Sequence, residues 1–333
     1  MDYKLDKFDV RIKDLNYISE LIIEAESKVF VIDKNVWEKH KLESIIANSP
    51  KYVYSASEEN KNYYELEKIY DFFLKSNVNR KTTIIAIGGG ITCDLAAYAA
   101  STYKRGCELI LVPTTLLAMV DAAIGGKTAI NFHNIKNCIG SFYPAKEIFI
   151  INEFLKTLSE DIYLNGVAEV VKTLFISNDI KLLKDSNISK EVLLTAVNKK
   201  MQICQADLYE QNIRKKLNLG HTFGHVLESC FEYTIPHGIC VALGMRIAAK
   251  LSLRLNKITN SRFNEINEIL DSFGLPKYYC SYYPRVTINK LKNILIQDKK
   301  FTKIPTIILF DNEGVYVENS LNLEVIAQSF FLD

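Results

Sequence analysis

The first half of the chain alternates short apolar stretches with longer stretches of helical periodicity. Runs rich in β-branched and other apolar residues predict strands at 28–33, 51–55, 82–87, 108–112 and 147–151. Between the second and third runs, apolar residues recur at helical spacing over 63–74, namely Leu66, Ile69, Tyr70 and Phe73. This alternation is typical of a parallel sheet covered by helices, and it predicts an α/β fold.

The pattern changes near residue 155. Long helical periodicities follow at 161–177, 190–209, 220–232, 240–255 and 262–273. Only two late segments, 305–310 and 314–317, are strand-like, and they predict a terminal hairpin. We therefore predict an N-terminal α/β domain with a Rossmann-like parallel sheet over 1–155, and a mainly α-helical C-terminal domain over 156–333.

Composition narrows the class of protein. The 333 residues suit about two domains, and 48% hydrophobic with 24% charged residues is typical of globular proteins. The formal net charge of +2 argues against non-specific nucleic-acid binding. No secretory signal and no membrane-spanning run is apparent, so a membrane is not an expected partner either. We therefore expect neither nucleic acid nor membrane as a partner. The seven cysteines include no C-x-x-C pair, which favours reduced thiols and a cytoplasmic location.

Glycine use points to a candidate site. Seven of the fourteen glycines lie between 88 and 140, although the chain is otherwise poor in glycine. The strand predicted over 82–87 runs into Gly88-Gly89-Gly90 and a helix with Asp94 in its first turn. Such a turn can cradle a phosphate on backbone N–H groups at a helix N-terminus, and it can equally be a plain strand–helix turn. The spacing is not G-x-G-x-x-G, so a standard Rossmann motif is absent.

Histidines gather late in the chain. Three of the five, His221, His225 and His237, lie within 17 residues. His221 and His225 have i, i+4 spacing and face one side of a helix, while Glu169 and Lys172 share a face of an earlier helix. Two histidines and a carboxylate suit a catalytic site for a divalent metal, although this spacing also occurs by chance. Spacing alone favours His221 and His225 as the ligand pair and leaves His237 outside it.

Basic residues in apolar or glycine-rich surroundings suggest a small anionic substrate, because guanidinium and ammonium groups bind phosphate and carboxylate. Any one of them could equally be a solvated surface residue. The set comprises Arg105, Lys127, Lys136, Lys172, Lys200, Arg214 and Lys299.

Taken together, these segments resemble the 3-dehydroquinate synthases. The resemblance rests on motifs in register from about residue 28 to 310. They are GGGITCDL (88–95), TYKRG (102–106), VPTTLLA (112–118), VD (120–121), GGKT (125–128), KNCIGSF (136–142), NGVAEVVK (165–172), LNLGHTFGH (217–225), HG (237–238) and DKK (298–300).

The resemblance implies a nucleotide-binding α/β domain followed by a helical metal-binding domain. It also implies conversion of 3-deoxy-D-arabino-heptulosonate 7-phosphate to 3-dehydroquinate and phosphate, the second step of the shikimate pathway. In this family NAD is used catalytically, oxidising a hydroxyl that is later restored, and a divalent metal (Zn²⁺ or Co²⁺) acts as a Lewis acid. The implied assembly is a homodimer.

Carried over position by position, the metal ligands are Glu169, His221 and His237. This replaces the ligand pair favoured by spacing, because His225 becomes a substrate contact. The substrate phosphate is surrounded by Lys127, Asn137, Asn218, His225 and Lys299, with Lys300 as an alternative to Lys299. Lys200 and Arg214 meet the substrate carboxylate, and Asp121 and Lys172 hold its hydroxyl face. Arg105 reaches the phosphate in the other subunit.

The implied NAD contacts fall into three groups. Gly89, Gly90, Ile91 and Asp94 lie at the pyrophosphate. Asp33, Asn35, Glu58 and Lys61 match the adenosine side. The remaining contact surface comprises Thr114, Thr115, Lys136, Thr157 and Leu158.

The chain also departs from the family pattern. Cys93 and Ser57 stand where the family usually has glycine, and Ile239 and Cys240 replace the usual Glu and Ala after His237-Gly238. Three alternatives stay open: another sugar-phosphate cyclase similar to 2-deoxy-scyllo-inosose synthase, a metal-dependent polyol dehydrogenase, and a non-enzymatic binding protein. Lys200 together with Arg214 favours a substrate that carries a carboxylate.

Overall fold

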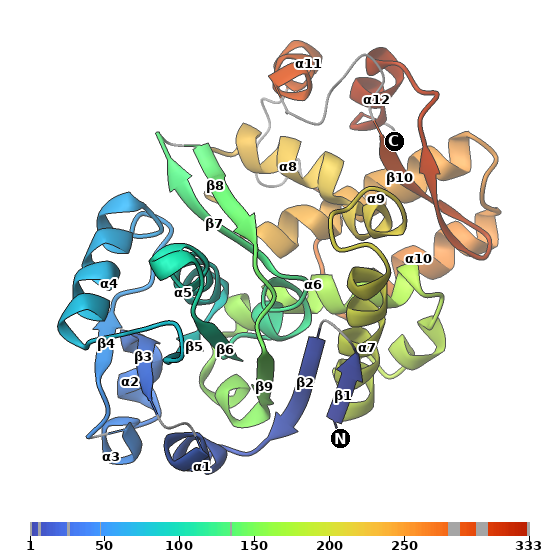
Figure 1. Cartoon of the computed structure of the whole chain (residues 1–333). Helices are drawn as coiled ribbons and strands as arrows, with labels where there is room; N and C mark the ends of the chain where they lie inside the picture. Colours follow the sequence, from blue (N-terminus) through green and yellow to red (C-terminus); the bar gives the residue numbers. More distant parts are fainter. Residues whose placement is uncertain are drawn as a thin grey trace. The chain divides into compact units, whose positions relative to one another are not determined.

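A seven-stranded sheet organises the N-terminal half in the computed structural model (Figure 1). The structure describes residues 2–5, 8–24, 27–46, 48–133, 135–278, 287–297 and 306–331. The strand order is β1-β2-β9-β6-β5-β3-β4, with six strands parallel and β1 antiparallel to β2 at the edge. The strands are β1 (Asp2–Leu5), β2 (Phe8–Lys13), β3 (Lys28–Asp33), β4 (Lys51–Tyr54), β5 (Thr83–Gly88), β6 (Glu108–Pro113) and β9 (Glu147–Ile151).

The predicted α/β fold is confirmed, and its five strands lie within a residue or two of the predicted ranges. The centre of the sheet is apolar on both faces, because parallel strands are covered on both sides. In β5, for example, the side chains of Ile84, Ile85 and Ile87 are all 0% exposed. β1 and β2 were not predicted, because in β2 charged residues such as Asp9 and Arg11 alternate with apolar ones.

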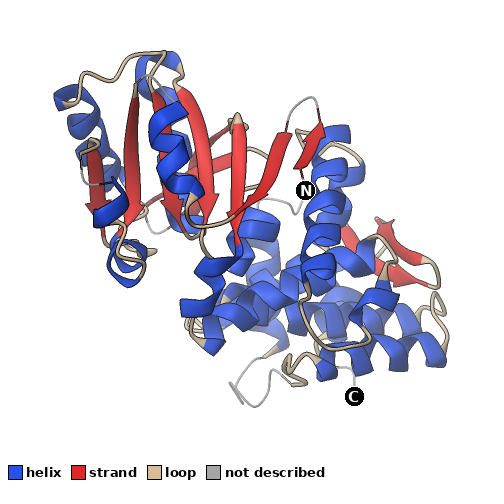
Figure 2. Ribbon diagram, turned by 90° about the horizontal axis from the view of Figure 1, so that it is seen from below, coloured by secondary structure: helices blue, strands red, loops and turns tan. Residues whose placement is uncertain are grey.

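Helices cover this sheet (Figure 2). α5 packs against β5 and β6, and α4 packs against α5. Asn62 caps α4 by accepting a hydrogen bond from the Glu65 N–H at 3.0 Å. The helices here are α1 (Tyr17–Glu24), α2 (Lys34–Lys39), α3 (Glu43–Ile46), α4 (Tyr63–Lys75) and α5 (Gly90–Thr102), with short turns η1 (Tyr103–Arg105) and η3 (Asn152–Thr157).

An unpredicted hairpin accounts for part of the glycine cluster. β7 (Lys127–Phe132) and β8 (Ile135–Phe142) pair antiparallel, and a π-helix, η2 (Ala118–Ala122), precedes them. Gly126 has φ 69°, and a Cβ there would lie 2.9 Å from the Pro144 nitrogen. This glycine serves the turn into the hairpin, so only the glycines at 88–90 belong to the strand–helix turn.

The C-terminal half is mainly helical and contains the hairpin, as predicted, but the hairpin is not terminal, because a short helix that was not predicted follows it. α9 is buried along most of its length and begins at His237 rather than at 240, directly after Pro236. The elements are α6 (Glu160–Ile176), α7 (Lys190–Ala206), α8 (His221–Cys230), α9 (His237–Arg254), α10 (Asn260–Ser272), α11 (Ile288–Gln297), α12 (Leu323–Ser329), η4 (Ile180–Leu183), η5 (Ile213–Asn218), β10 (Ile307–Asp311) and β11 (Gly314–Glu318).

The chain forms two compact units. The first comprises Met1–Tyr163 with Lys200–Tyr209, and the second comprises Leu164–Lys199 with Glu210–Asp333. α7 therefore contributes its first part to the second unit and its last part to the first. The functional division predicted at 155/156 stays a prediction. Within the described residues, every helix is too short or too polar to span a lipid bilayer.

Candidate functional site

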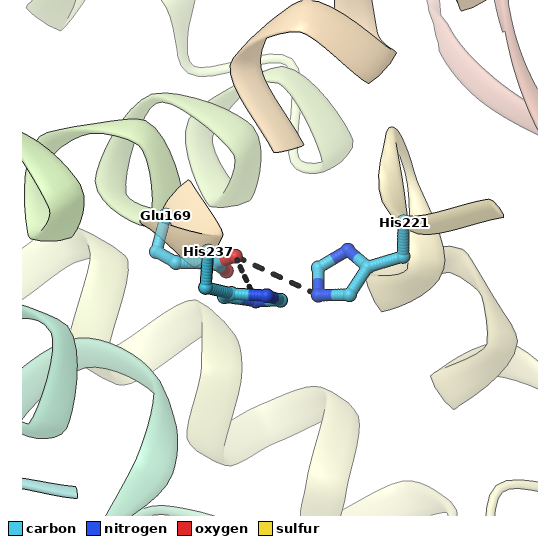
Figure 3. A group of neighbouring side chains, drawn as sticks. All are labelled: Glu169, His221 and His237. Carbon is cyan, nitrogen blue, oxygen red and sulfur yellow. Dashed lines mark ion pairs between the residues drawn. The ribbon is translucent and has the colours of Figure 1, made fainter. Parts of the chain in front are cut away.

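Three helices of the second unit bring one carboxylate and two imidazoles together (Figure 3). Glu169 comes from α6, His221 is the first residue of α8, and His237 is the first residue of α9. Glu169 Oε1 lies 3.6 Å from His221 Nε2 and 3.6 Å from His237 Nε2. Donor atoms around a tetrahedral zinc ion with bonds of about 2.0–2.1 Å are about 3.3 Å apart, so this spacing fits a divalent metal.

A second group shares one histidine with the first. His225, Glu228 and His237 also have potential ligand atoms within 4.8 Å of one another. However, Glu228 Oε1 and His237 Nδ1 are 2.6 Å apart, which is a hydrogen-bond distance and too short for two donors on one metal. The geometry thus favours the ligand set implied by the resemblance over the His221–His225 pair. The assignment of ligands stays a prediction.

The pKa values of the two candidate histidine ligands shift in opposite directions. Burial, reinforced by the nearby positive charge of Lys172, lowers the pKa of His221 well below its usual value. Burial also opposes the charged form of His237, but the hydrogen bonds that its ring donates to the Glu169 and Glu228 carboxylates prevail and raise its pKa to about 10. Lys172 is ion-paired with Glu169, and both side chains are almost fully buried. A cation that binds here must therefore displace a proton from His237.

Close backbone contacts place these helices. A Cβ at Gly244 of α9 would lie 2.0 Å from the carbonyl oxygen of Gly220, the residue before His221. A Cβ at Gly238 would lie 1.9 Å from the carbonyl oxygen of Asn165 in α6. Because these positions carry no side chain, α9 approaches both α6 and the start of α8 at backbone distance. The three candidate ligands meet as a result.

Two further predicted site residues lie in this unit on η5. Arg214 is 3% exposed, and the Asn218 amide donates to Glu210 Oε1 at 2.5 Å. His225 lies on α8 beside the candidate ligands, its ring centroid 5.3 Å from that of His221. Glu210 was not predicted. Its carboxylate fixes Asn218, and sequence spacing alone gave no sign of this contact.

In the first unit, the predicted substrate residues Asp121 and Lys200 meet. Asp121 lies in the π-helix and its Oδ1 accepts from Lys200 Nζ of α7 at 2.5 Å. Lys200 is 6% exposed, so this ammonium group is held in place by a carboxylate rather than solvated. The residues are 79 positions apart in the sequence, and only the fold brings them together.

The glycine turn at 88–90 joins the end of β5 to the N-terminus of α5, as predicted for a phosphate-binding turn. Gly89 precedes α5 without a side-chain cap, so the helix N–H groups stay available to an anion. A Cβ at Gly89 would lie 3.1 Å from Thr115 Cγ2, and the Thr114 N–H donates to the Gly88 carbonyl. Ile91 lies in the first turn of the same helix.

Lys61 joins two predicted site residues. Its Nζ donates to Asp94 Oδ2 at 2.5 Å and to Asn137 Oδ1 at 2.6 Å, and Lys61 is 4% exposed. Burial raises the pKa of Asp94, and the charge of Lys61 opposes this rise. Asn137 was assigned to the substrate phosphate, and in this structure its side chain contacts a residue from the predicted nucleotide set.

The other predicted nucleotide residues lie on the first unit as well. Asp33 ends β3 and accepts from the Asn35 N–H at 3.1 Å, and burial raises the pKa of its carboxyl. Glu58 Oε1 accepts from the Asn131 amide at 2.7 Å. Thr157 lies at the end of η3, followed by Leu158, and its hydroxyl lies 2.8 Å from His40 Nε2. His40 and Asn131 were not predicted.

Three predicted basic residues do not share these buried settings. Lys127 and Lys136 are exposed on β7 and β8, and Arg105 is exposed at the end of η1 with φ 67°. Lys299, with its alternative Lys300, lies outside the described residues.

Comparisons with known proteins identify the family of this chain. A family model described as 3-dehydroquinate synthase N-terminal matches residues 51–165, and one described as 3-dehydroquinate synthase C-terminal matches 166–301. A 3-dehydroquinate synthase of Clostridium tetani is 34% identical over 344 residues, covering 99% of this chain and 90% of the relative. One of Helicobacter pylori is 40% identical over 254 residues, covering 74% and 73%.

A solved structure supports the fold. ValA, a 2-epi-5-epi-valiolone synthase from Streptomyces hygroscopicus subsp. jinggangensis 5008 with NAD⁺ and Zn²⁺ bound, superposes with a TM-score of 0.86. The alignment covers 99% of this chain and 97% of that one at 23% identity. At this identity the likeness establishes the two-domain fold and nothing more.

Proposed function

The chain belongs to the 3-dehydroquinate synthase family, and on this basis we propose that it converts 3-deoxy-D-arabino-heptulosonate 7-phosphate to 3-dehydroquinate and inorganic phosphate. The observation that carries the proposal is the grouping of a buried carboxylate, Glu169, with two partly buried histidines, His221 and His237. When bound, NAD would accept and return a hydride, and a divalent metal, Zn²⁺ or Co²⁺, would act as a Lewis acid on the reacting hydroxyls. The enzyme would therefore be a phosphate-eliminating lyase with no net redox change.

The residues of the chain would bind and orient the substrate. The buried cations Lys200 and Arg214 would receive its carboxylate, since charge-assisted hydrogen bonds are strongest where water is excluded. Asp121 would hold Lys200 through their 2.5 Å contact. Asn218 and His225 would meet the phosphate, with Lys127, Asn137 and Lys299 as the other predicted contacts. Lys172, paired with Glu169, would contact the hydroxyl face.

Phosphate release tests this function directly. With NAD present, the heptulosonate 7-phosphate should release inorganic phosphate, and absorbance at the NADH band should not build up. Chelation of the metal should stop release, and added Zn²⁺ or Co²⁺ should restore it. NADH accumulating with a polyol would instead establish a dehydrogenase. Turnover of glucose 6-phosphate but not the heptulosonate would establish a different cyclase.

Substitution of Lys61 tests the nucleotide residues. Lys61→Met would remove the charge-assisted contact that Lys61 is proposed to make with NAD. Such a contact contributes about 1.5–3 kcal/mol, so NAD affinity should fall roughly 10- to 100-fold. Isothermal titration of NAD into the metal-loaded protein measures this change. Lys68→Met is the matched control, because the Lys68 side chain is 62% exposed and pairs with Glu65 rather than with a predicted nucleotide residue, so NAD affinity should stay unchanged. Equal affinities in both variants would refute the role of Lys61.

We also propose that the enzyme works as a homodimer in the cytoplasm. Arg105 is exposed in the single chain. Exposure is expected of a residue that reaches into a partner subunit. The seven cysteines of the sequence include no C-x-x-C pair, in keeping with a reducing compartment. Light scattering coupled to gel filtration would measure the dimer, and Arg105→Ala should lower phosphate release without changing metal content.

A further inference from the structure

We propose that Glu228 is a positioning residue for the metal site, because its carboxylate holds the His237 ring with Nε2 directed to the metal. This inference rests on the proposed metal site of Glu169, His221 and His237. Glu228 itself would not touch the metal or the substrate.

The hydrogen bond determines which nitrogen remains available. Glu228 Oε1 and His237 Nδ1 are 2.6 Å apart, and an ionised carboxylate can only accept, so Nδ1 carries the proton. With a metal bound, the proton that stays on Nδ1 leaves Nε2 with its lone pair, on the side where Nε2 lies 3.6 Å from Glu169 Oε1. A hydrogen bond on the outer nitrogen of a metal-binding histidine fixes both its tautomer and its orientation.

The other histidine is held in the same way by a different group. His221 Nδ1 lies 3.2 Å from the backbone carbonyl oxygen of Leu219, which again leaves Nε2 facing Glu169. Both rings therefore present Nε2 to one point. Their supports differ in charge, since a carbonyl is neutral and Glu228 is anionic.

The negative charge of Glu228 would offset positive charges that surround the proposed metal site. His221 and His237 are each the first residue of a helix, where the positive end of the helix dipole opposes a bound cation. Lys172 adds a further positive charge beside Glu169. Glu228 lies beside this cluster with its side chain 12% exposed, so its charge is poorly screened by water.

Helix geometry explains how Glu228 reaches His237. In α8, His221, His225 and Glu228 have i, i+4, i+7 spacing and so share one face of the helix. That face meets the N-terminus of α9, because Gly244 lets the two helices pack closely. The sequence shows this spacing, but it does not show that His237 is the partner of Glu228.

Metal affinity provides the test. The Zn²⁺ dissociation constant is measured by competition with a chelating dye, without substrate. We expect Glu228→Ala to weaken binding roughly 10- to 100-fold. Glu228→Gln keeps an acceptor for Nδ1–H and should weaken binding less. The visible spectrum of the Co²⁺-loaded Ala variant should shift, whereas that of the Gln variant should stay close to the unsubstituted protein.

The control variant is Glu232→Gln, an exposed carboxylate beyond the end of α8, which should bind Zn²⁺ unchanged. Unchanged NAD affinity and an unchanged circular dichroism spectrum would show that a variant is folded. If Glu228→Ala does not fold, the near-isosteric Glu228→Gln alone tests the inference. Affinity within twofold of the unsubstituted protein for both Glu228 variants would overturn the inference. So would a loss in Glu228→Ala as large as in Glu169→Gln, because Glu228 would then be a ligand. If Glu169→Gln bound Zn²⁺ normally, the metal site itself would be wrong.

Discussion

His237→Ala is expected to lose both the bound metal and phosphate release. The substitution removes one of three donors, and Glu169 with His221 then leaves a site with only two. The loss of affinity should exceed the 10- to 100-fold cost of removing an outer hydrogen-bond partner. Metal content after dialysis and initial rates of phosphate release would measure the two effects on the same sample.

His225→Ala is the matched comparison, because it also removes an imidazole ring from this histidine cluster. It should retain metal and lose turnover, since His225 is assigned to the substrate phosphate. The reverse result, with metal lost in His225→Ala and kept in His237→Ala, would establish the pair favoured by i, i+4 spacing. The two variants therefore separate the two interpretations of the histidine cluster.

Gly244→Ala is expected to damage stability and metal binding together. The added Cβ would lie 2.0 Å from the Gly220 carbonyl oxygen and 2.9 Å from the Gly224 nitrogen, and backbone atoms cannot rotate away. Overpacking of this kind costs about 1–3 kcal/mol, and α8 must shift to accommodate the methyl group. Because His221 follows Gly220 directly, the shift should also weaken Zn²⁺ binding. Urea unfolding and chelator competition would measure the two effects.

The control for Gly244→Ala is Gly274→Ala, where a Cβ would have no neighbour within 4 Å. That position has φ 70°, so the substitution costs strain of about 1–2 kcal/mol without a clash. Its Zn²⁺ affinity should be unchanged. Equal Zn²⁺ affinity in the two variants would show that the contact between α8 and α9 does not place the ligands.

The sequence predicted the elements that are buried on a regular pattern. The central strands are continuous apolar runs, and the long C-terminal helices have clear periodicity, so both were found. The strands β1 and β2 and the hairpin β7–β8 were missed because charged or polar residues, such as Asp9 in β2 and Lys127 and Asn131 in β7, interrupt their apolar pattern. Of their pairings, only that of β2 with β9 joins segments that are remote in the sequence.

The candidate site was predictable in its residue types but not in its pairings. Periodicity placed His221 and His225 on one helix face, and only the family resemblance included His237. Its proximity to Glu169 requires the close contact of α9 with α6, which local spacing does not encode. Contacts such as Glu228 with His237, or Asp121 with Lys200, likewise arise from the tertiary fold.

The division of α7 between the two compact units limits how this protein can be taken apart. The chain passes from one unit to the other after Tyr163, after Lys199 and again after Tyr209. A fragment cut at residue 155 would carry Asp121 without Lys200, and the remaining fragment would carry Lys200 without its carboxylate. Exchange of a nucleotide module between relatives by a single splice would therefore break this ion pair. A working chimera would need the segment Lys200–Tyr209 to be transferred together with the N-terminal unit.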